Sequence, residues 1–262
     1  MSRYLVDVRE PTQFVPRSSR EKKDFESAWA LHGWPQPHVW RDRAFFGEGD
    51  AYFLKVAKMA PTLRPKYINR ALRLPREAKH LGWLAERGQP APALIAWGRE
   101  RRLGFTTRAF LIVRTIPGAR DLEAFLADPE VSKEARTRAM GAVGEAVARL
   151  HAAGFFHQDL ATRNILVRAR GDDFEVYFID FPRSERSIWA ARRGYLRRAD
   201  LLRFARNAMD RGARDEEIRA ALVAAAPDLA DAVLRHCARL RGKDETRTWR
   251  SNLWLYFGLR TA

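Results

Sequence analysis

The chain has 262 residues, 46% of them hydrophobic and 31% charged, a balance typical of a soluble globular protein and not of a disordered one. Its 48 Lys and Arg residues against 32 Asp and Glu residues give a net charge of +16, which favours phosphate-rich or otherwise anionic partners. The single cysteine excludes an intrachain disulfide framework, the charged N-terminus argues against a secretory signal peptide, and no apolar run approaches the ~20 residues of a membrane-spanning helix. We therefore expect a cytoplasmic protein.

The first part of the chain predicts strands around one helix. The apolar segment 51–58 follows GEGD, which predicts a strand entered through a hairpin turn. A basic connector then leads to a helix with Pro75 at its first position and Glu77 in its first turn, where proline and acidic residues are favoured. Apolar residues recur at helical spacing as far as Gly88, which we expect at the C′ position.

The rest of the chain predicts one more buried strand and then mainly helices. The apolar run within 108–116 predicts that strand, and the segment after it predicts a helix capped by Asp121. Residues 134–153 place apolar side chains on one helical face, VYFID predicts a short strand, and the Arg-rich chain beyond about residue 185 has a helical pattern. Strands therefore come early and helices late, which predicts two lobes.

Two charged residues of the strand-rich part suggest a site for nucleotide phosphates. Lys55 lies inside the predicted strand 51–58, where a buried ammonium group needs a partner. Glu77 in the following helix is a suitable partner. Two simpler interpretations stay open. Lys55 is a solvated residue of an edge strand, and Glu77 only stabilises the N-terminus of its helix by interacting with the helix macrodipole.

The segments HQDLATRNILV and FIDF have the spacing of a phosphoryl-transfer site. That reaction needs a cation for the nucleotide phosphates, ligands for Mg²⁺ and a carboxylate that orients the attacking hydroxyl. Asp159 and Asn164 match the H-x-D-x-x-x-x-N catalytic loop, and Asp180 follows a strand as the D-F-G aspartate does. Taken alone, each of these three residues is explained equally well as a turn, loop or strand-end residue. Their order after Lys55 and Glu77 favours a kinase.

The same segments resemble a known family. HQDLATRNILV is similar to the protein-kinase catalytic loop, and its DLATRN to the DLAARN of tyrosine kinases. YFLK before a basic connector, HAAGFFHQDLATRNILV, and FIDFPRS followed by RRADLLRFARNA resemble the bacterial lipopolysaccharide kinases. Those enzymes phosphorylate Kdo or heptose of the lipid A–core glycolipid at the inner face of the cytoplasmic membrane. The resemblance covers roughly residues 40–210.

The resemblance implies a fold, a reaction and a location. The fold is the α/β (α+β) protein-kinase-like bilobal fold, with a small strand-rich N-lobe over 1–116 and a larger helical C-lobe over 117–262. The implied reaction is transfer of the ATP γ-phosphate, with Mg²⁺, to a sugar hydroxyl of the lipopolysaccharide core glycolipid. The protein would be cytoplasmic and peripheral to the anionic inner face of the inner membrane.

Carried over residue by residue, the resemblance also implies catalytic roles. Lys55 would contact the α- and β-phosphates of ATP and pair with Glu77. Asp159 would accept or orient the proton of the sugar hydroxyl. Asn164 and Asp180 would bind Mg²⁺.

Further residues are implied at the edges of the site. Arg114, Thr115 and Ile116 would lie at the hinge beside adenine, where Thr115 and Ile116 have backbone groups to offer. Arg163 and Arg183 are candidates for stabilising charge on the transferring phosphoryl group, because a guanidinium placed there favours the transition state.

The sequence also departs from the protein-kinase pattern. No G-x-G-x-x-G precedes Lys55, Pro182 stands at the position of the D-F-G glycine, and Gln158 replaces the arginine before the catalytic aspartate. No A-P-E segment follows Asp180. These departures argue against a protein substrate and fit a glycolipid or small-molecule acceptor. A kinase for another acceptor and a nucleotide-binding pseudokinase remain alternatives, the latter because the Gly-rich loop is missing.

Basic and aromatic residues concentrate in three stretches. Residues 64–79 and 191–206 are rich in Arg and Lys, which is typical either of a solvated helix face or of contact with anionic lipid head groups. In the second stretch we expect the arginines to stay in water. The aromatic segment 248–260 either packs on the core or lies at a membrane interface. No nucleic-acid-binding signature accompanies the charge, so no nucleic acid partner is expected.

Overall fold

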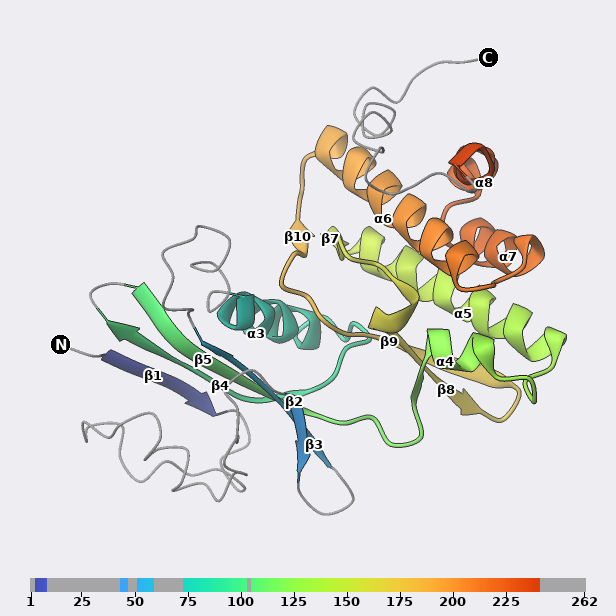
Figure 1. Cartoon of the computed structure of the whole chain (residues 1–262). Helices are drawn as coiled ribbons and strands as arrows, with labels where there is room; N and C mark the ends of the chain where they lie inside the picture. The colour runs from blue at the N-terminus through green and yellow to red at the C-terminus, as the bar shows by residue number, and fades with distance from the viewer. Residues whose placement is uncertain (1–2, 9–42, 47–50, 59–72, 103–104, 241–262) are drawn as a thin grey trace. The chain divides into compact units, whose positions relative to one another are not determined.

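The computed structural model describes residues 3–8, 43–46, 51–58, 73–102 and 105–240 (Figure 1). The expected hairpin turn at 47–50, the aromatic segment 248–260 and most of the basic stretch 64–79 lie outside the described residues. The chain divides into two compact units, Met1–Pro117 and Gly118–Ala262, and each is described by itself. Within the described residues, no helix is long and apolar enough to cross a bilayer.

The first unit is built on a five-stranded antiparallel sheet. Its strands lie in the order β1-β4-β5-β3-β2. Their bounds are β1 Arg3–Val8, β2 Arg43–Phe46, β3 Tyr52–Lys58, β4 Leu94–Arg102 and β5 Phe105–Arg114. The continuous run Ala109–Val113 of β5 is buried, as expected of a strand covered on both faces. β3 pairs with both β5 and β2, so it is not an edge strand.

One helix, α3 (Arg73–Ala85), packs against this sheet (Figure 1). The helix begins two residues before the expected start, so Glu77 is its fifth residue and the expectation that it lies in the first turn is wrong. The early start is compatible with Pro75, because the N–H groups of the first turn have no intrahelical acceptor to lose. Glu77 is therefore not explained by a position at the helix N-terminus.

The C-terminal end of α3 is set by a glycine. Gly88 has a φ of +59°, the left-handed conformation that glycine adopts without steric cost. The N–H of Gln89 donates to the carbonyl of Leu84 at 2.9 Å, and the N–H of Gly88 donates to that of Ala85 at 3.1 Å. This pair of hydrogen bonds is the Schellman motif, which confirms Gly88 at the C′ position.

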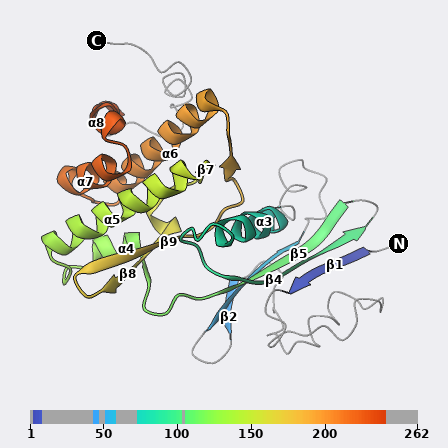
Figure 2. The ribbon, with the colours of Figure 1, turned by 180° about the vertical axis from the view of Figure 1, so that it is seen from behind.

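The second unit combines small sheets with a group of helices (Figure 1, Figure 2). One sheet has the order β6-β8-β9, and β7 pairs with β10. The strands are β6 Arg120–Asp121, β7 Phe155–Phe156, β8 Ile165–Arg170, β9 Asp173–Phe178 and β10 Glu185–Arg186. The helices are α4 Leu122–Ala127, α5 Lys133–Ala152, the 3₁₀ turn η2 Thr162–Asn164, α6 Ala190–Asp210, α7 Asp215–Ala225 and α8 Pro227–Leu240.

The helix predictions in this unit are confirmed in detail. The carboxylate of Asp121 accepts a hydrogen bond from the N–H of Ala124 at 2.7 Å and caps α4. The helix expected at 134–153 is α5, whose buried face includes Met140, Val143, Val147 and Leu150. α5 packs closely against α7: a Cβ added at Gly144 would lie 2.1 Å from the carbonyl oxygen of Ala221. The absence of a side chain at Gly144 therefore permits this helix contact.

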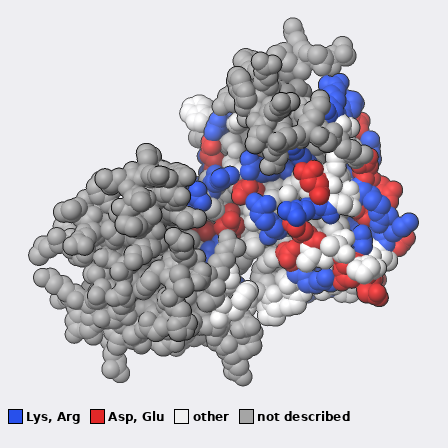
Figure 3. All heavy atoms as spheres, viewed as in Figure 1, with Lys and Arg blue, Asp and Glu red and all other residues white. Residues whose placement is uncertain are grey.

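The arginines of α6 stay at least partly in water, as expected, but several of them also make specific contacts. The guanidinium of Arg192 makes two hydrogen bonds to Glu185, at 2.7 and 2.6 Å. Arg197 makes two to Asp228, at 3.2 and 3.0 Å. Arg193 donates to backbone carbonyls at the end of α5. Acidic residues accordingly lie among the basic ones on the described face of the second unit in Figure 3.

Candidate active site

In the first unit, Lys55 and Glu77 form a largely buried ion pair. Nζ of Lys55 on β3 lies 2.7 Å from Oε1 of Glu77 on α3, and the side chains are 11% and 4% exposed. Removing either partner would leave the other charge in a poorly solvated place, which is strongly unfavourable. The contact expected from the sequence is present, and a solvated Lys55 on an edge strand is excluded.

The residues expected at the hinge end β5 and follow it. The N–H of Arg114 donates to the carbonyl of Ala93, and the N–H of Thr115 donates to that of Ala51, both at 2.9 Å. The N–H of Thr115 is thus already used within the sheet. Contacts of this segment with adenine stay a prediction, which now depends on its carbonyl groups and on Ile116.

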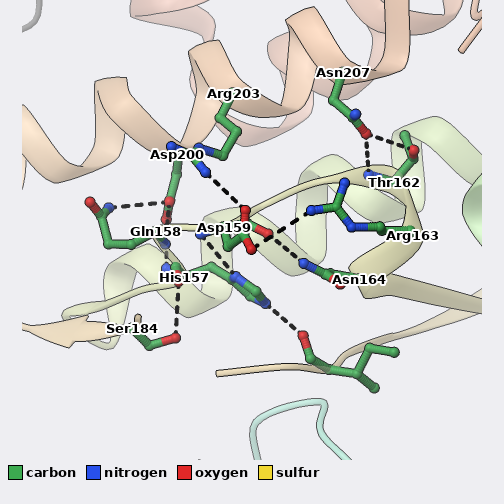
Figure 4. Close-up of polar contacts among 11 residues, drawn as sticks. His157, Gln158, Asp159, Thr162, Arg163, Asn164, Ser184, Asp200, Arg203 and Asn207 are labelled. Carbon is green, nitrogen blue, oxygen red and sulfur yellow. Dashed lines mark hydrogen bonds and ion pairs between the residues drawn. The ribbon is translucent and has the colours of Figure 1, made fainter. Parts of the chain in front are cut away.

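In the second unit, the loop between β7 and η2 is held by one fully buried carboxylate, that of Asp200 (Figure 4). Its oxygens accept hydrogen bonds from the N–H groups of His157 at 2.7 Å and Gln158 at 2.6 Å. Two side chains add to these, Nε2 of His151 at 3.1 Å and Nε2 of Gln158 at 3.2 Å. Four donors satisfy the buried charge and fix the backbone that leads into Asp159.

Backbone strain marks two residues of this region. Gln158 and Asp180 have φ values of +60° and +67°, in the left-handed region where residues other than glycine are uncommon. Such conformations persist only where neighbouring contacts enforce them. For Gln158, the hydrogen bonds to Asp200 supply that constraint.

His157 is a structural element of the loop. Its Nε2 lies 2.9 Å from the carbonyl oxygen of Ile179, to which it donates, and its Nδ1 accepts from the N–H of Asp159 at 3.3 Å. These partners require the neutral ring, protonated at Nε2 only. Complete burial lowers the pKa of His157, although the nearby Asp200 carboxylate opposes this shift. His157 therefore joins the catalytic loop to the segment that carries Asp180.

The carboxylate of Asp159 faces two arginines (Figure 4). Its Oδ1 accepts a hydrogen bond from Nη1 of Arg203 at 2.8 Å, and its Oδ2 lies 3.8 Å from Nη2 of Arg163. The side chain of Asp159 is 18% exposed, so a carboxylate oxygen is within reach of a bound hydroxyl. This arrangement is suited to accepting a proton while both arginines hold the carboxylate in place.

Asn164 and Asp180 lie on neighbouring chain segments. The N–H of Ile179 donates to the carbonyl of Asn164 at 3.0 Å, and Nδ2 of Asn164 donates to the backbone carbonyl of Asp159 at 2.8 Å. That second bond directs the amide nitrogen of Asn164 inward and leaves its oxygen as the atom that can bind a cation. Among the described residues there is no cluster of three His, Cys, Asp or Glu side chains for a metal ion. Mg²⁺ needs none, since it binds through one or two protein oxygens together with phosphates and water.

The α6 helix supports the whole loop through three polar residues that the sequence analysis missed. Asp200 holds His157 and Gln158, and Arg203 holds Asp159. Oδ1 of Asn207 accepts from both the N–H and the hydroxyl of Thr162, at 2.7 and 2.8 Å. Positions i, i+3 and i+7 share one face of a helix. Polar residues at this spacing among apolar ones are the signal that points to them.

Arg183 lies exposed after Phe181, which is buried. Its role stays a prediction. Arg163 is the one of the two arginine candidates that contacts Asp159.

Comparisons with known proteins agree with this geometry. The model of the lipopolysaccharide kinase (Kdo/WaaP) family matches residues 62–225. The 3-deoxy-D-manno-octulosonic acid kinase of Mannheimia succiniciproducens is 32% identical over 101 residues, which are 38% of this chain and 40% of that protein. The enzyme of the same name from Vibrio parahaemolyticus is 33% identical over 109 residues, 42% of each chain. The match thus spans about two fifths of the length of these curated relatives.

A solved structure described as WaaP in complex with acyl carrier protein is also similar. Its TM-score is 0.61 at 20% identity, over 96% of this chain and 99% of that one. This likeness to a kinase-like fold confirms the predicted α/β protein-kinase-like fold class. Together with the family match over more than half of the residues, it also confirms the resemblance found in the sequence. The chain belongs to the lipopolysaccharide kinase (Kdo/WaaP) family.

Proposed function

We propose that this protein is an ATP-dependent kinase that phosphorylates a sugar hydroxyl, on Kdo or heptose, of the lipopolysaccharide lipid A–core. The observation that carries the proposal is the Asp159 carboxylate, held between Arg203 and Arg163 on a loop fixed by a buried aspartate. Family membership supports the reaction class. The names of both curated relatives favour Kdo over heptose as the acceptor.

In this proposal the acceptor hydroxyl attacks the γ-phosphorus of ATP while Asp159 takes its proton. The new O–P bond forms as the bond between the γ-phosphorus and the β-phosphate oxygen breaks, and ADP leaves. Lys55, oriented by Glu77, binds the α- and β-phosphates. Asn164 and Asp180 would hold Mg²⁺, which neutralises phosphate charge when bound.

The lobes 1–116 and 117–262 would then serve as the nucleotide-covering and catalytic parts. The glycolipid acceptor implies a protein peripheral to the anionic inner face of the cytoplasmic membrane. Basic residues on such a surface each contribute about 1 kcal/mol of attraction near anionic lipid. Because Arg192 and Arg197 are paired with acidic residues, we expect a modest attraction. The solved WaaP structure contains acyl carrier protein, which differs from the membrane partner proposed for this chain.

Transfer of labelled γ-phosphate from ATP to purified lipid A–core tests the proposal. Asp159→Asn should lower kcat by about 10²- to 10⁴-fold, the usual contribution of a general base, and leave ATP binding nearly intact. Asp231→Asn is the matched control, since Asp231 pairs with Arg219 at 2.8 Å, the distance from Asp159 to Arg203.

The outcomes separate the alternatives. Label that enters only protein would overturn the acceptor assignment, and unchanged turnover in Asp159→Asn would overturn the assignment of the base. ATP binding without any transfer would identify a pseudokinase instead.

A further inference from the structure

Arg203 is paired differently from Arg192 and Arg197 of the same helix. Arg192 and Arg197 each donate hydrogen bonds from two guanidinium nitrogens to one carboxylate. Within the described residues, Arg203 meets Asp159 through Nη1 alone, and its side chain is 46% exposed. A guanidinium group carries five N–H donors in a planar fork. Arg203 therefore holds Asp159 with one edge and retains donors for a second anion.

Arg163 adds a second guanidinium at the same carboxylate. It is 54% exposed and lies 3.8 Å from Asp159, beyond hydrogen-bonding distance. Two positive charges thus face one negative charge around the proposed base. One more carboxylate bound there would balance the charges, and the attraction of the two guanidinium groups would offset its repulsion by Asp159.

The position of Arg203 indicates that this excess positive charge serves to bind the acceptor. Figure 4 shows Arg203 reaching Asp159 from α6, with Asn164 on another side of the loop. Asn164 belongs to the proposed metal and nucleotide side. Nη1 of Arg203 contacts Oδ1 of Asp159, so its remaining donors lie close to the carboxylate that would receive the acceptor proton.

We propose that Arg203, assisted by Arg163, binds a carboxylate on the acceptor sugar next to the hydroxyl that is phosphorylated. The substrate class is then a sugar acid, and this subsite rests on the proposed kinase function. Guanidinium groups bind carboxylates through paired, charge-assisted hydrogen bonds. Binding in this way places the neighbouring hydroxyl against Asp159, which takes its proton as the phosphoryl group is transferred from ATP.

The test compares two acceptors and two variants. The acceptors are lipid A bearing a terminal 3-deoxy-D-manno-octulosonic acid, and the same glycolipid with that sugar's carboxylate converted to a carboxamide. For the wild type, kcat/KM should favour the acid. Arg203→Gln should reduce kcat/KM for the acid by about 10- to 100-fold, mainly through KM, as expected for lost hydrogen bonds to a charged group. For the amide it should reduce kcat/KM less, because that acceptor loses only the support that Arg203 gives to Asp159, so the preference for the acid disappears.

Arg219→Gln is the control variant, because Arg219 makes an exposed ion pair with Asp231 at the same 2.8 Å. It should keep the preference for the acid. Since Arg203 is nearly half exposed, Arg203→Gln should fold, and circular dichroism checks this.

Three results would overturn the subsite. Equal loss for both acceptors in Arg203→Gln would mean that Arg203 only positions Asp159. A raised KM for ATP with an unchanged KM for the acceptor would mean that it binds the nucleotide. Equal use of both acceptors by the wild type would remove the carboxylate subsite and leave the kinase function intact. Transfer to neither acceptor would instead refute the proposed function, and the subsite with it.

Discussion

Asp200→Ala removes the acceptor of four hydrogen bonds at the base of the catalytic loop. The side chain of Gln158 is partly exposed and can turn to water. The other three donors, the N–H groups of His157 and Gln158 and the imidazole of His151, lie in buried or partly buried contacts, where water reaches a donor poorly. The substitution therefore leaves three polar groups unsatisfied.

The expected loss of stability follows from that number. An unsatisfied buried donor costs about 1–3 kcal/mol, so three donors together cost about 3–9 kcal/mol. Part of this loss is offset, because the alanine variant no longer buries the carboxylate of Asp200, which is 0% exposed. We expect the free energy of unfolding to fall by about 3–5 kcal/mol, the lower part of that range.

Activity should fall further than stability alone requires. The left-handed conformation of Gln158 costs about 1–2 kcal/mol, and without Asp200 the residue is released to a negative φ. That change moves the next residue, Asp159. Phosphoryl transfer should therefore be impaired even at temperatures where Asp200→Ala is folded.

Urea unfolding followed by circular dichroism measures the first effect, and phosphoryl transfer below the unfolding transition measures the second. The control Asp231→Ala removes an exposed carboxylate and should stay within about 0.5 kcal/mol of the wild type. An Asp200→Ala variant within about 1 kcal/mol of the wild type, with normal transfer, would refute the proposed support of the loop.

Other predictions concern packing, pH and charge. Gly144→Ala should lower the free energy of unfolding by about 1–3 kcal/mol because its Cβ would lie 2.1 Å from the carbonyl oxygen of Ala221, whereas Gly141→Ala, with open space around its Cβ, should be neutral or stabilising in urea unfolding. The folded-state pKa of His157 is lowered, so the unfolded chain binds that proton more readily and stability should fall as the pH drops below about 6.5. Urea midpoints at several pH values should show a smaller decline in His157→Asn than in the wild type. An equal decline would mean that protonation of His157 does not cause the loss of stability. Binding to anionic vesicles should weaken as ionic strength rises, because salt screens the attraction. Binding that does not change with salt would show that the basic stretch 191–206 does not attract the protein to the membrane.

The sequence predicted those parts of the site that are local in the chain. The spacing of Asp159 and Asn164 is fixed by a short loop, so a motif of eight positions is enough to find them. Helix ends at Asp121 and Gly88 were predictable for the same reason, because caps depend on one residue and its near neighbours.

What the sequence did not predict depends on residues distant in the chain. Asp200 and Arg203 contact the catalytic loop across 42–44 residues, and only the folded helix brings them there. Both residues also lie in an arginine-rich stretch, which suggested a solvated helix face and gave no reason to single them out. The start of α3 was misplaced because proline is tolerated throughout the first helical turn, so Pro75 does not fix the first residue.

In the proposed function, Lys55 of the first unit and Asp180 of the second bind the same nucleotide. Labelling of the wild type with an acyl-phosphate derivative of ATP, followed by mass spectrometry of the peptides, tests it most directly. We predict acylation of Lys55 that is suppressed both by excess Mg²⁺–ATP and by Asp180→Asn. Acylation spread over exposed lysines, or labelling of Lys55 that is unchanged in Asp180→Asn, would contradict the claim.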